Sequence, residues 1–320
     1  EARAGADSLA DAQLTCVLLA AAGACAEVSK ALRVLSLAPA SAQAGGTVNV
    51  QGETQKGMDV VANDLFVSAL TGHVAAMASE EEEEAIAGAA NRKYEIAFDP
   101  LDGSSNLDTN LPTGSIFCVL EHTPGHPFQG SGRAKIVAAG YALYSASIEL
   151  VLSLGGGTVA MGFTFDPSRR DFVLSRPALK CPSRGPYYSL NDAREPDWPE
   201  GLRRWVSDAK RGEVPSGTKF SSRYVCALVA DVHRTLIRGG WAGNPRPHLR
   251  LLYEAMPLAH IAEACGGRAS DGVRDILDIE PTGLHDRLPV FIGSAEDVAE
   301  LVAYGDVQQG ATAYTECKDK

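Results

Sequence analysis

The sequence predicts an α/β protein, and two contrasting patterns along its 320 residues carry that prediction. Apolar segments of strand length recur between residues 115 and 174, separated by short connections with Gly or Asp-Pro, which is typical of a sheet. Beyond residue 185, strands are interleaved with longer segments of helical apolar spacing. This change of pattern predicts a domain boundary near residue 180, between domains of residues 1–180 and 181–320.

In the first domain, residues 9–35 are expected to form a helix, because charged residues follow an Ala-rich apolar stretch at helical spacing. Residues 47–51 alternate like a strand, residues 59–70 have helical spacing, and residues 74–77 suggest another strand. The remaining strands of this domain are expected at residues 94–98, 115–120, 138–144, 148–154, 159–165 and 172–174. Helices of the second domain are expected at residues 231–238, 254–265 and 295–304.

The bulk composition restricts the classes of partner. A net charge of −11 and a pI near 5.1 argue against binding to nucleic acid or to an anionic membrane. No apolar run is expected to be long enough to span a bilayer. The seven cysteines are scattered, which indicates a reducing compartment, the cytoplasm or a plastid stroma, for a soluble protein. Because the chain begins at Glu1, the possibility of an upstream segment such as a transit peptide is left open.

The most informative segment is Phe98-Asp-Pro-Leu-Asp-Gly-Ser-Ser-Asn-Leu-Asp108. Two carboxylates, Asp99 and Asp102, follow a strand-like run and precede a turn of small residues. Mg²⁺ binds through a few carboxylates together with substrate phosphate, and such a turn offers backbone N–H groups to the same phosphate. The segment therefore predicts half of a metal-dependent phosphate site, although ordinary turns have the same composition.

Ordered motifs along nearly the whole chain resemble the fructose-1,6-bisphosphatase family, within the Mg²⁺-dependent, lithium-sensitive phosphatases. Besides residues 98–108, they are Asp59-Val-Val-Ala-Asn-Asp64, Ser79-Glu-Glu81, Tyr188-Ser-Leu-Asn191, Arg223-Tyr224, Val229-Ala-Asp-Val-His-Arg-Thr-Leu236, Leu249-Arg-Leu-Leu-Tyr-Glu254 and Ile279-Glu-Pro-Thr282. The resemblance implies a layered α-β-α-β-α sandwich, with an antiparallel sheet in the first domain and a mixed sheet in the second.

The resemblance also implies the metal site. It is expected to hold two or more Mg²⁺ ions, for which Mn²⁺ can substitute, in the N-terminal metal- and phosphate-binding domain. The implied ligands are the side chains of Glu80, Glu81, Asp99, Asp102 and Glu254, and the backbone carbonyl of Leu101. The rest of the acidic run, residues 82–84, is interpreted as a solvated face.

Catalytic roles follow from the same resemblance. Asp64 is expected to activate or orient the attacking water, with Glu81 as the second catalytic carboxylate. An alternative for Asp64 is an ordinary carboxylate at the start of a helix. The backbone amides of Gly103, Ser104 and Ser105 are expected to cradle the phosphate that is removed.

The C-terminal domain is expected to bind the sugar and its second phosphate. Asn191, Arg223 and Tyr224 match family positions that hold this phosphate, the Arg reaching across from a neighbouring subunit, and Arg250 matches a position near the sugar. The chain departs from the family at three further binding positions, where Arg194, Asn244 and His248 replace two aromatics and a Lys.

These replacements leave the source of positive charge open. Arg194 or Arg246 can restore the charge, and His248 can contribute only when protonated, near its ordinary pKa of about 6.5. The loop before His248 is also short.

The expected reaction is hydrolysis of the 1-phosphate of a ketose bisphosphate in carbohydrate metabolism, with fructose 1,6-bisphosphate preferred. Sedoheptulose 1,7-bisphosphate, or dual specificity, is the alternative, because residues 108–110 and Asn244 resemble that branch. An inositol monophosphatase fits less well, because the distal residues would then have no phosphate to bind. A catalytically idle relative with a regulatory role is the remaining alternative. A homotetramer or homodimer is implied.

Two forms of regulation are expected to be weak or absent. The start of the first helix reads Asp11-Ala-Gln-Leu-Thr15 where AMP-inhibited members have a Thr-Gly-Glu turn, although Lys93 and Tyr94 match part of the nucleotide site. The region of residues 120–138 lacks the cysteine-bearing insertion of light-regulated plastid members.

Overall fold

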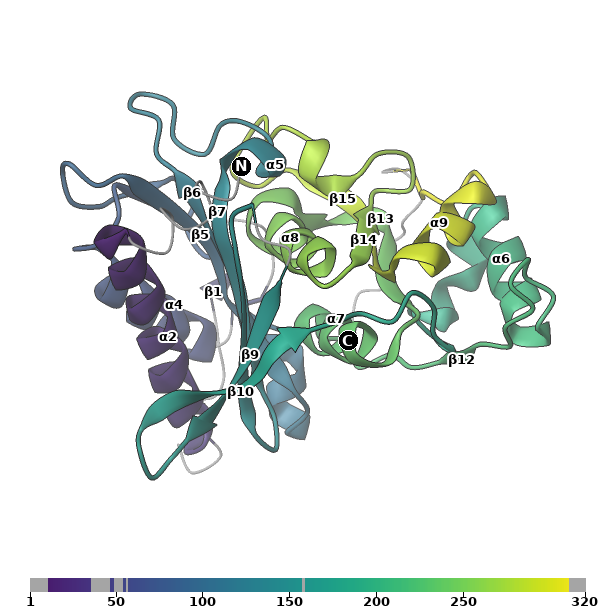
Figure 1. The fold of residues 1–320 in the computed structure, drawn as a ribbon, viewed down its shortest axis with the longest axis horizontal. Helices are drawn as coiled ribbons and strands as arrows, with labels where there is room; N and C mark the ends of the chain where they lie inside the picture. Colours follow the sequence, from purple (N-terminus) through teal and green to yellow (C-terminus); the bar gives the residue numbers. More distant parts are fainter. Residues whose placement is uncertain (1–10, 36–46, 49–53, 56, 157–158, 311–320) are drawn as a thin grey trace.

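The computed structural model describes residues 11–35, 47–48, 54–55, 57–156 and 159–310. Two large sheets alternate with three layers of helices (Figure 1). Helices α2 and α4 cover the outer face of the first sheet, α7 and α8 lie between the sheets, and α6 and α9 cover the outer face of the second. The predicted α/β layered sandwich is therefore confirmed.

The outer layer beside the first sheet consists of α2 (Ala12–Leu32) and α4 (Gly57–Leu70), which pack on each other. Phe66 of α4 stacks on Phe98 of the sheet, with ring centroids 5.0 Å apart. The expected strand at residues 47–51 appears in part, since Thr47–Val48 (β1) pairs antiparallel with Thr54–Gln55 (β2). Its residues 49–51, and residues 9–10 of the expected helix, lie outside the described residues.

By length and composition, α2 is apolar enough to cross a membrane, contrary to the expectation that no stretch reaches this length. One face of the helix is buried, however, in the same hydrophobic cluster as α4 and the first sheet. The packing is that of an outer helix that covers the first sheet with one face.

The start of α2 is held by a cluster of polar contacts. Asp11 caps the helix by accepting the backbone N–H of Gln13 at 2.8 Å. Its other carboxylate oxygen accepts the Lys93 ammonium at 2.8 Å and the Tyr94 hydroxyl at 2.9 Å. Hydrogen bonding from Lys93 lowers the pKa of Asp11 to about 2.

The first sheet has the order β10-β9-β8-β7-β6-β5-β3-β4. All neighbouring strands are antiparallel except β3 and β5, which are parallel, so the sheet is mixed and the prediction of a purely antiparallel first sheet is wrong at this pair. The strands are β3 (Ala76–Ser79), β4 (Ile86–Ala87), β5 (Tyr94–Asp102), β6 (Thr113–Glu121), β7 (Ile136–Tyr144), β8 (Ile148–Leu154), β9 (Ala160–Asp166) and β10 (Asp171–Leu179). A short helix, α5 (Gly132–Lys135), precedes β7, and a 3₁₀ helix, η2 (Ser104–Thr109), follows β5.

The second sheet has the order β12-β11-β13-β15-β14 and is mixed. Strand β11 pairs parallel with β12 and β13, whereas β15 pairs antiparallel with β13 and β14. The strands are β11 (Tyr187–Ser189), β12 (Ser221–Ser222), β13 (Trp241–Arg250), β14 (Gly267–Ser270) and β15 (Arg287–Ser294).

Helices α7 (Leu228–Arg238) and α8 (Met256–Ala264) form the layer that both sheets share. A π-helical turn, η4 (Leu251–Ala255), leads into α8, and a 3₁₀ turn, η5 (Ile276–Asp278), follows β14. One hydrophobic cluster joins Tyr141 of the first sheet, Ile261 of α8 and Ile292 of the second sheet. The two sheets thus pack around a common hydrophobic core.

The last layer consists of α6 (Glu200–Arg211), preceded by the 3₁₀ helix η3 (Asp192–Asp197), and α9 (Ala295–Ala303). Trp205 of α6 packs edge-on against Trp241 of β13, with centroids 5.0 Å apart. The sequence analysis did not predict α6, whose apolar residues occupy only one face.

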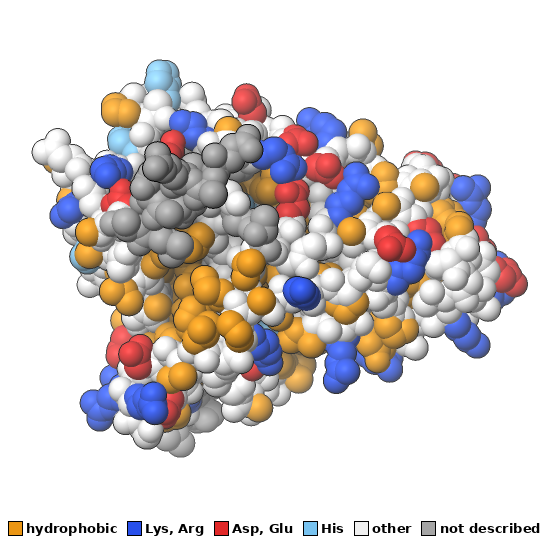
Figure 2. Space-filling model, in the orientation of Figure 1, with side chains coloured by type: hydrophobic (Ala, Val, Ile, Leu, Met, Phe, Trp, Pro, Cys, Tyr) orange, Lys and Arg blue, Asp and Glu red, His pale blue; other side chains and the backbone are white. Residues whose placement is uncertain are grey.

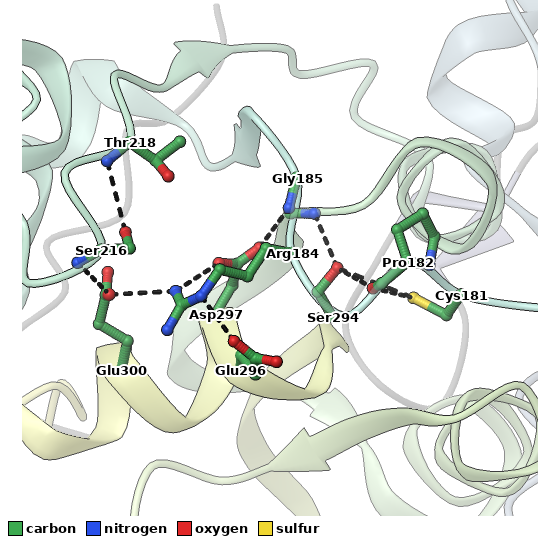
Figure 3. Close-up of polar contacts among 11 residues, drawn as sticks. Cys181, Pro182, Arg184, Gly185, Ser216, Thr218, Ser294, Glu296, Asp297 and Glu300 are labelled. Carbon is green, nitrogen blue, oxygen red and sulfur yellow. Dashed lines mark hydrogen bonds and ion pairs between the residues drawn. The ribbon is translucent and has the colours of Figure 1, made fainter.

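The segment between the two sheets is anchored by Arg184 (Figure 3). Its guanidinium lies 2.7 Å from Glu296 and 3.1 Å from both Asp297 and Glu300 of α9. Asp297 also accepts the backbone N–H of Gly185 at 2.8 Å. Arg184 therefore compensates the charge of the buried carboxylate of Asp297 and fixes the second sheet's entry strand against α9.

The surface is mixed in charge. On the face in Figure 2, acidic and basic side chains are interspersed over α6 and α9, and hydrophobic side chains gather over the first sheet near β9. No broad positive surface of the kind that binds nucleic acid is visible on this face.

Candidate active site

A bulge in β5 places Asp99 and Asp102 on one side of the chain. In a regular strand, residues three apart face opposite sides. Here Asp99 pairs with Ile116 and Asp102 with Gly114, so that three steps on β5 oppose two on β6. The extra residue of this bulge turns both carboxylates the same way.

The third carboxylate comes from the other half of the chain. Glu254 lies in η4, where its carboxylate accepts the backbone N–H of Arg250 at 2.5 Å. Carboxylate oxygens of Asp99, Asp102 and Glu254 all lie within 4.8 Å of one another, and all three residues are buried. Three converging oxygen donors are what a hard divalent cation requires.

Burial and mutual repulsion disfavour ionisation of this cluster. Burial, with the charges of Glu80, Asp102 and Glu254, raises the pKa of Asp99 well above its ordinary value. Burial raises the pKa of Asp102 to about 7, although the backbone N–H groups of Val229 and Leu228 oppose the rise. Burial and the Glu80 charge likewise raise the pKa of Glu254. A bound cation would relieve these costs.

Arg250 supplies positive charge next to the cluster. The residue is 3% exposed, and its guanidinium lies 2.9 Å from the Glu80 carboxylate and 4.0 Å from that of Glu254. The sequence analysis placed Arg250 near the sugar, whereas in the structure it also pairs with two of the predicted metal ligands.

Helix α4 and the turn after β3 carry the remaining carboxylates. Ser79 donates to the Asn63 side chain at 2.7 Å and accepts the backbone N–H of Glu81 at 3.2 Å, which ties the acidic turn to α4. Glu81 lines the cavity described below. Asp64 is exposed and is not among the described lining residues, whereas Asp59, in the first turn of α4, is buried and does line the cavity.

Sequence reasoning singled out Asp64 and gave Asp59 no role. Five residues along a helix correspond to about 140° of rotation, so that the two carboxylates leave α4 in different directions. The burial of Asp59 depends on how α4 packs, which local sequence does not reveal. The role of Asp64 stays a prediction.

The turn after Asp102 fits closely against α7. Gly103 has φ +75°, and a Cβ at this position would lie 2.5 Å from the Cβ of Ala227, so that only glycine fits. The backbone N–H of Val229, at the start of α7, donates to the Asp102 carboxylate at 2.7 Å. Ser104 and Ser105 then begin η2 at the wall of the cavity.

These groups surround one cavity of about 550 Å³ that also contains most of the predicted distal residues. The predicted site residues lining it are Glu80, Glu81, Asp99, Leu101, Asp102, Gly103, Ser104, Ser105, Asn191, Arg194, Tyr224, Asn244, His248, Arg250 and Glu254. Arg223 is exposed and is not among the described lining residues; its guanidinium lies over the ring of Tyr187, 5.4 Å from the centroid.

His248 differs from the expectation that its charge would change near pH 6.5. Burial lowers the pKa of His248 to about 3, and the positive charges of Arg246, Arg250 and Arg287 act in the same direction. The imidazole is therefore neutral at physiological pH. The arginines around it carry the positive charge of this end of the cavity.

Two family profiles match the chain in succession. The profile described as "Fructose-1-6-bisphosphatase, N-terminal domain" matches residues 3–177, and the profile "Fructose-1-6-bisphosphatase, C-terminal domain" matches residues 181–306. The chain belongs to the fructose-1,6-bisphosphatase family. Its members are phosphatases, and dependence on metal is general among them.

Relatives within this family come from plants and bacteria. The chloroplastic fructose-1,6-bisphosphatase of Pisum sativum is 38% identical, over 92% of this chain and 79% of the relative. A class 1 fructose-1,6-bisphosphatase of Sorangium cellulosum is 44% identical, over 80% of this chain and 78% of the relative. The holo-form crystal structure of Leishmania major fructose-1,6-bisphosphatase has a TM-score of 0.85 and 32% identity, covering 93% of this chain and 95% of that one.

Proposed function

We propose that this protein hydrolyses the 1-phosphate of fructose 1,6-bisphosphate to give fructose 6-phosphate and phosphate, with Mg²⁺ as the cofactor. The observation that carries the proposal is a single cavity with a carboxylate cluster at one end and phosphate-binding side chains at the other. The family relationship agrees with this arrangement.

The donor set fits Mg²⁺. Asp99, Asp102 and Glu254 supply clustered carboxylate oxygens, and Glu80, Glu81 and the carbonyl of Leu101 lie in the same cavity wall. Two or more Mg²⁺ ions, or Mn²⁺ in their place, would lower the pKa of a bound water and neutralise charge on the phosphoryl oxygens.

The protein's own groups bind the substrate phosphate and orient the metal ligands and the attacking water. The amides of Gly103, Ser104 and Ser105 hold the phosphate that leaves, and Arg250 keeps Glu80 and Glu254 in place. Asp64 orients the attacking water or accepts its proton, and Glu81 is the second catalytic carboxylate. Asp64→Asn is expected to lower kcat more than it raises KM.

The seven-carbon sugar is the alternative substrate, because the distal pocket departs from the usual family residues. Of the two features that resemble the sedoheptulose branch, Asn244 lies in the catalytic cavity, whereas residues 108 and 110 line a separate cavity of about 600 Å³ beside α2. This division favours the six-carbon substrate. A catalytically idle relative is disfavoured because no predicted metal carboxylate is missing.

The protein is also proposed to form a homotetramer or homodimer in which Arg223 reaches a neighbour's cavity. The exposure of Arg223, together with its position outside the described lining of its own cavity, supports this arrangement. The compartment proposed is the cytoplasm or a plastid stroma, and the relatives include a chloroplastic protein and a protein from a bacterium. We also propose that residues 1–180 form the metal- and phosphate-binding domain and that residues 181–320 form the domain that binds the sugar and its second phosphate.

The test is Mg²⁺-dependent phosphate release from fructose 1,6-bisphosphate and sedoheptulose 1,7-bisphosphate, measured side by side as kcat/KM. We expect a higher value for the six-carbon sugar and loss of turnover in Asp99→Asn. A preference for the seven-carbon sugar would establish the alternative. No release from either substrate by the unaltered protein would refute the proposal.

A further inference from the structure

A wide bulge interrupts β13 beside the catalytic cavity. Asn244 pairs with Val290 of β15, and the next pair is Leu249 with Leu288, so that five steps on β13 oppose only two on β15. The three additional residues leave the plane of the sheet. Pro245, Arg246 and Pro247 occupy the start of this bulge.

The bulge has a restricted conformation. The two prolines have fixed φ angles and no N–H group, so this stretch cannot rejoin the ladder. The side-chain oxygen of Asn244 accepts the backbone N–H of Arg246 at 3.2 Å, and the carbonyl of Pro245 accepts the backbone N–H of Gln309 at 2.7 Å. Asn244 thus acts on the backbone of the bulge, and Arg246 is held from both sides.

Arg246 lies where the catalytic cavity meets a smaller one of about 60 Å³. The residues common to the two linings are Asn191, Arg194, Tyr224, Gly243, Asn244 and Arg246. None of the metal carboxylates lines the smaller cavity, which marks it as the end remote from the proposed metal site. Among its described lining residues, Arg194 and Arg246 are the basic ones.

We propose that Arg246, presented by the proline-flanked bulge and positioned by Asn244, is the principal cationic ligand that this subunit itself supplies for the second phosphate of the bisphosphate substrate, beside Arg223 of the partner subunit in the proposed oligomer. This inference rests on the proposed function and names the residue that gives it specificity for a bisphosphate over a monophosphate. His248 is neutral, so it supplies no charge, and Arg194 is the supporting cation on the opposite segment. A guanidinium carried by a restrained backbone segment can bind a phosphate with two parallel donors, and the restraint lowers the entropic cost of placing it.

The experiment compares Arg246→Ala and Arg246→Lys with the unaltered protein, and Arg203→Ala is the matched control. Arg203 is an exposed arginine on α6 that pairs with Glu200. The substrates are fructose 1,6-bisphosphate and fructose 1-phosphate, which lacks the second phosphate. Loss of a charge-assisted pair is expected to raise KM for the bisphosphate about 10- to 100-fold, with kcat changed less than about threefold.

Three further results are expected. The kcat/KM for fructose 1-phosphate stays the same in Arg246→Ala, Arg246→Lys retains part of the affinity, and Arg203→Ala changes nothing. Asn244→Ala raises KM for the bisphosphate less than Arg246→Ala, and the double variant adds nothing to Arg246→Ala, as a positioning role requires. An unchanged KM in Arg246→Ala, or an equal loss on both substrates, would overturn the inference.

Calorimetric binding of fructose 6-phosphate separates this inference from the proposed function. If the unaltered protein releases no phosphate, the proposed reaction fails, yet the ligand assignment is still decided by this measurement. Weaker binding in Arg246→Ala than in Arg203→Ala supports the assignment, and equal binding refutes it.

Discussion

At the scale of single residues, neighbouring charges decide what each ionisable group can do. His248 is buried, and Arg246, Arg250 and Arg287 add positive charge near it, so both burial and these charges disfavour a proton on its imidazole. For Asp99, burial and the negative charges of Glu80, Asp102 and Glu254 disfavour the ionised carboxylate instead. Residue identity alone therefore misleads: the histidine holds no positive charge, and the carboxylates need a cation.

The neutrality of His248 predicts a specific pH response. The kcat/KM profiles of the unaltered protein and of His248→Gln, recorded between pH 6 and 8, should have the same shape, because the side chain is uncharged in both. The ratio kcat/KM reports groups of the free enzyme, and the comparison cancels titration of the substrate phosphate. A limb near pH 6.5 that disappears in His248→Gln would contradict the assignment.

The lowered pKa of His248 also determines how its contribution to folding stability changes with pH. Since the folded pKa of about 3 lies below the unfolded value, the folded state binds this proton less well than the unfolded state. The contribution of His248 to stability is therefore present above pH 6.5 and is lost as the pH falls towards 3.

At the scale of elements, caps and bulges place the functional groups. The bulge in β5 directs Asp99 and Asp102 together, and the bulge in β13 directs Arg246 into the cavity. The N-terminus of α2 is joined to β5 by Asp11, which contacts Lys93 and Tyr94. Those two residues match part of the family's nucleotide site, and weak inhibition by AMP stays a prediction.

Asp11→Ala is expected to lower the free energy of unfolding by about 1 kcal/mol, the usual cost of losing a helix cap. The matched control is Glu27→Ala, which removes an exposed ion pair within the same helix, and should cost less than about 0.5 kcal/mol. Denaturant titrations at pH 7 measure both. Equal losses in the two variants would show that the cap contributes nothing.

The pH dependence of this effect also has a definite direction. The folded pKa of Asp11 is about 2, below its ordinary value of 3.8, so its carboxylate stabilises the fold above that value. The difference between the unaltered protein and Asp11→Ala should shrink as the pH falls towards 2.

Most elements could be predicted because their apolar periodicity is local. The strands of the first sheet and helices α7, α8 and α9 lie close to their expected ranges. Helix α6 was missed although its buried residues, Leu202, Trp205, Val206 and Ala209, have the local spacing that predicts a helix with one apolar face. The shape of β13, in contrast, was hidden, since a bulge is defined by its partner strand and not by its own residues.

The site residues likewise fall into those that the sequence could predict and those that it could not. The carboxylates of residues 80, 99, 102 and 254 were recognisable because they belong to dense motifs, and the structure brings them into one cavity. The burial of Asp59, the charge state of His248 and the presentation of Arg246 each depend on tertiary neighbours. No local signal in the sequence carries that information.

At the scale of the whole molecule, the proposed metal site joins the two halves of the chain. Asp99 and Asp102 come from the first sheet, whereas Glu254 comes from the turn that enters α8. Without a cation, three buried carboxylates repel one another at the point where the halves meet. A ligand that binds only the folded state must therefore stabilise the molecule as a unit.

Addition of Mg²⁺ at about 100 times its dissociation constant is expected to stabilise the fold by about 2.7 kcal/mol. The melting temperature should then rise by about 4 °C, given the unfolding entropy expected for a chain of this length. Glu254→Gln should abolish most of this rise while leaving the metal-free protein as stable as before, because the change also removes repulsion. Differential scanning calorimetry measures both, with NaCl at equal ionic strength as the control. A full Mg²⁺ response in Glu254→Gln would exclude this residue as a ligand.

The layer of α7 and α8 between the sheets has a consequence for chimeras made from relatives. Each face of this layer is complementary to a different sheet, with Tyr141 on one side and Ile292 on the other in one continuous cluster. A graft that exchanges only the N-terminal half would place a foreign sheet against the native helices. Parental stability would then return only when the facing residues of α7 and α8 are exchanged with that sheet, although they lie beyond any junction near residue 180.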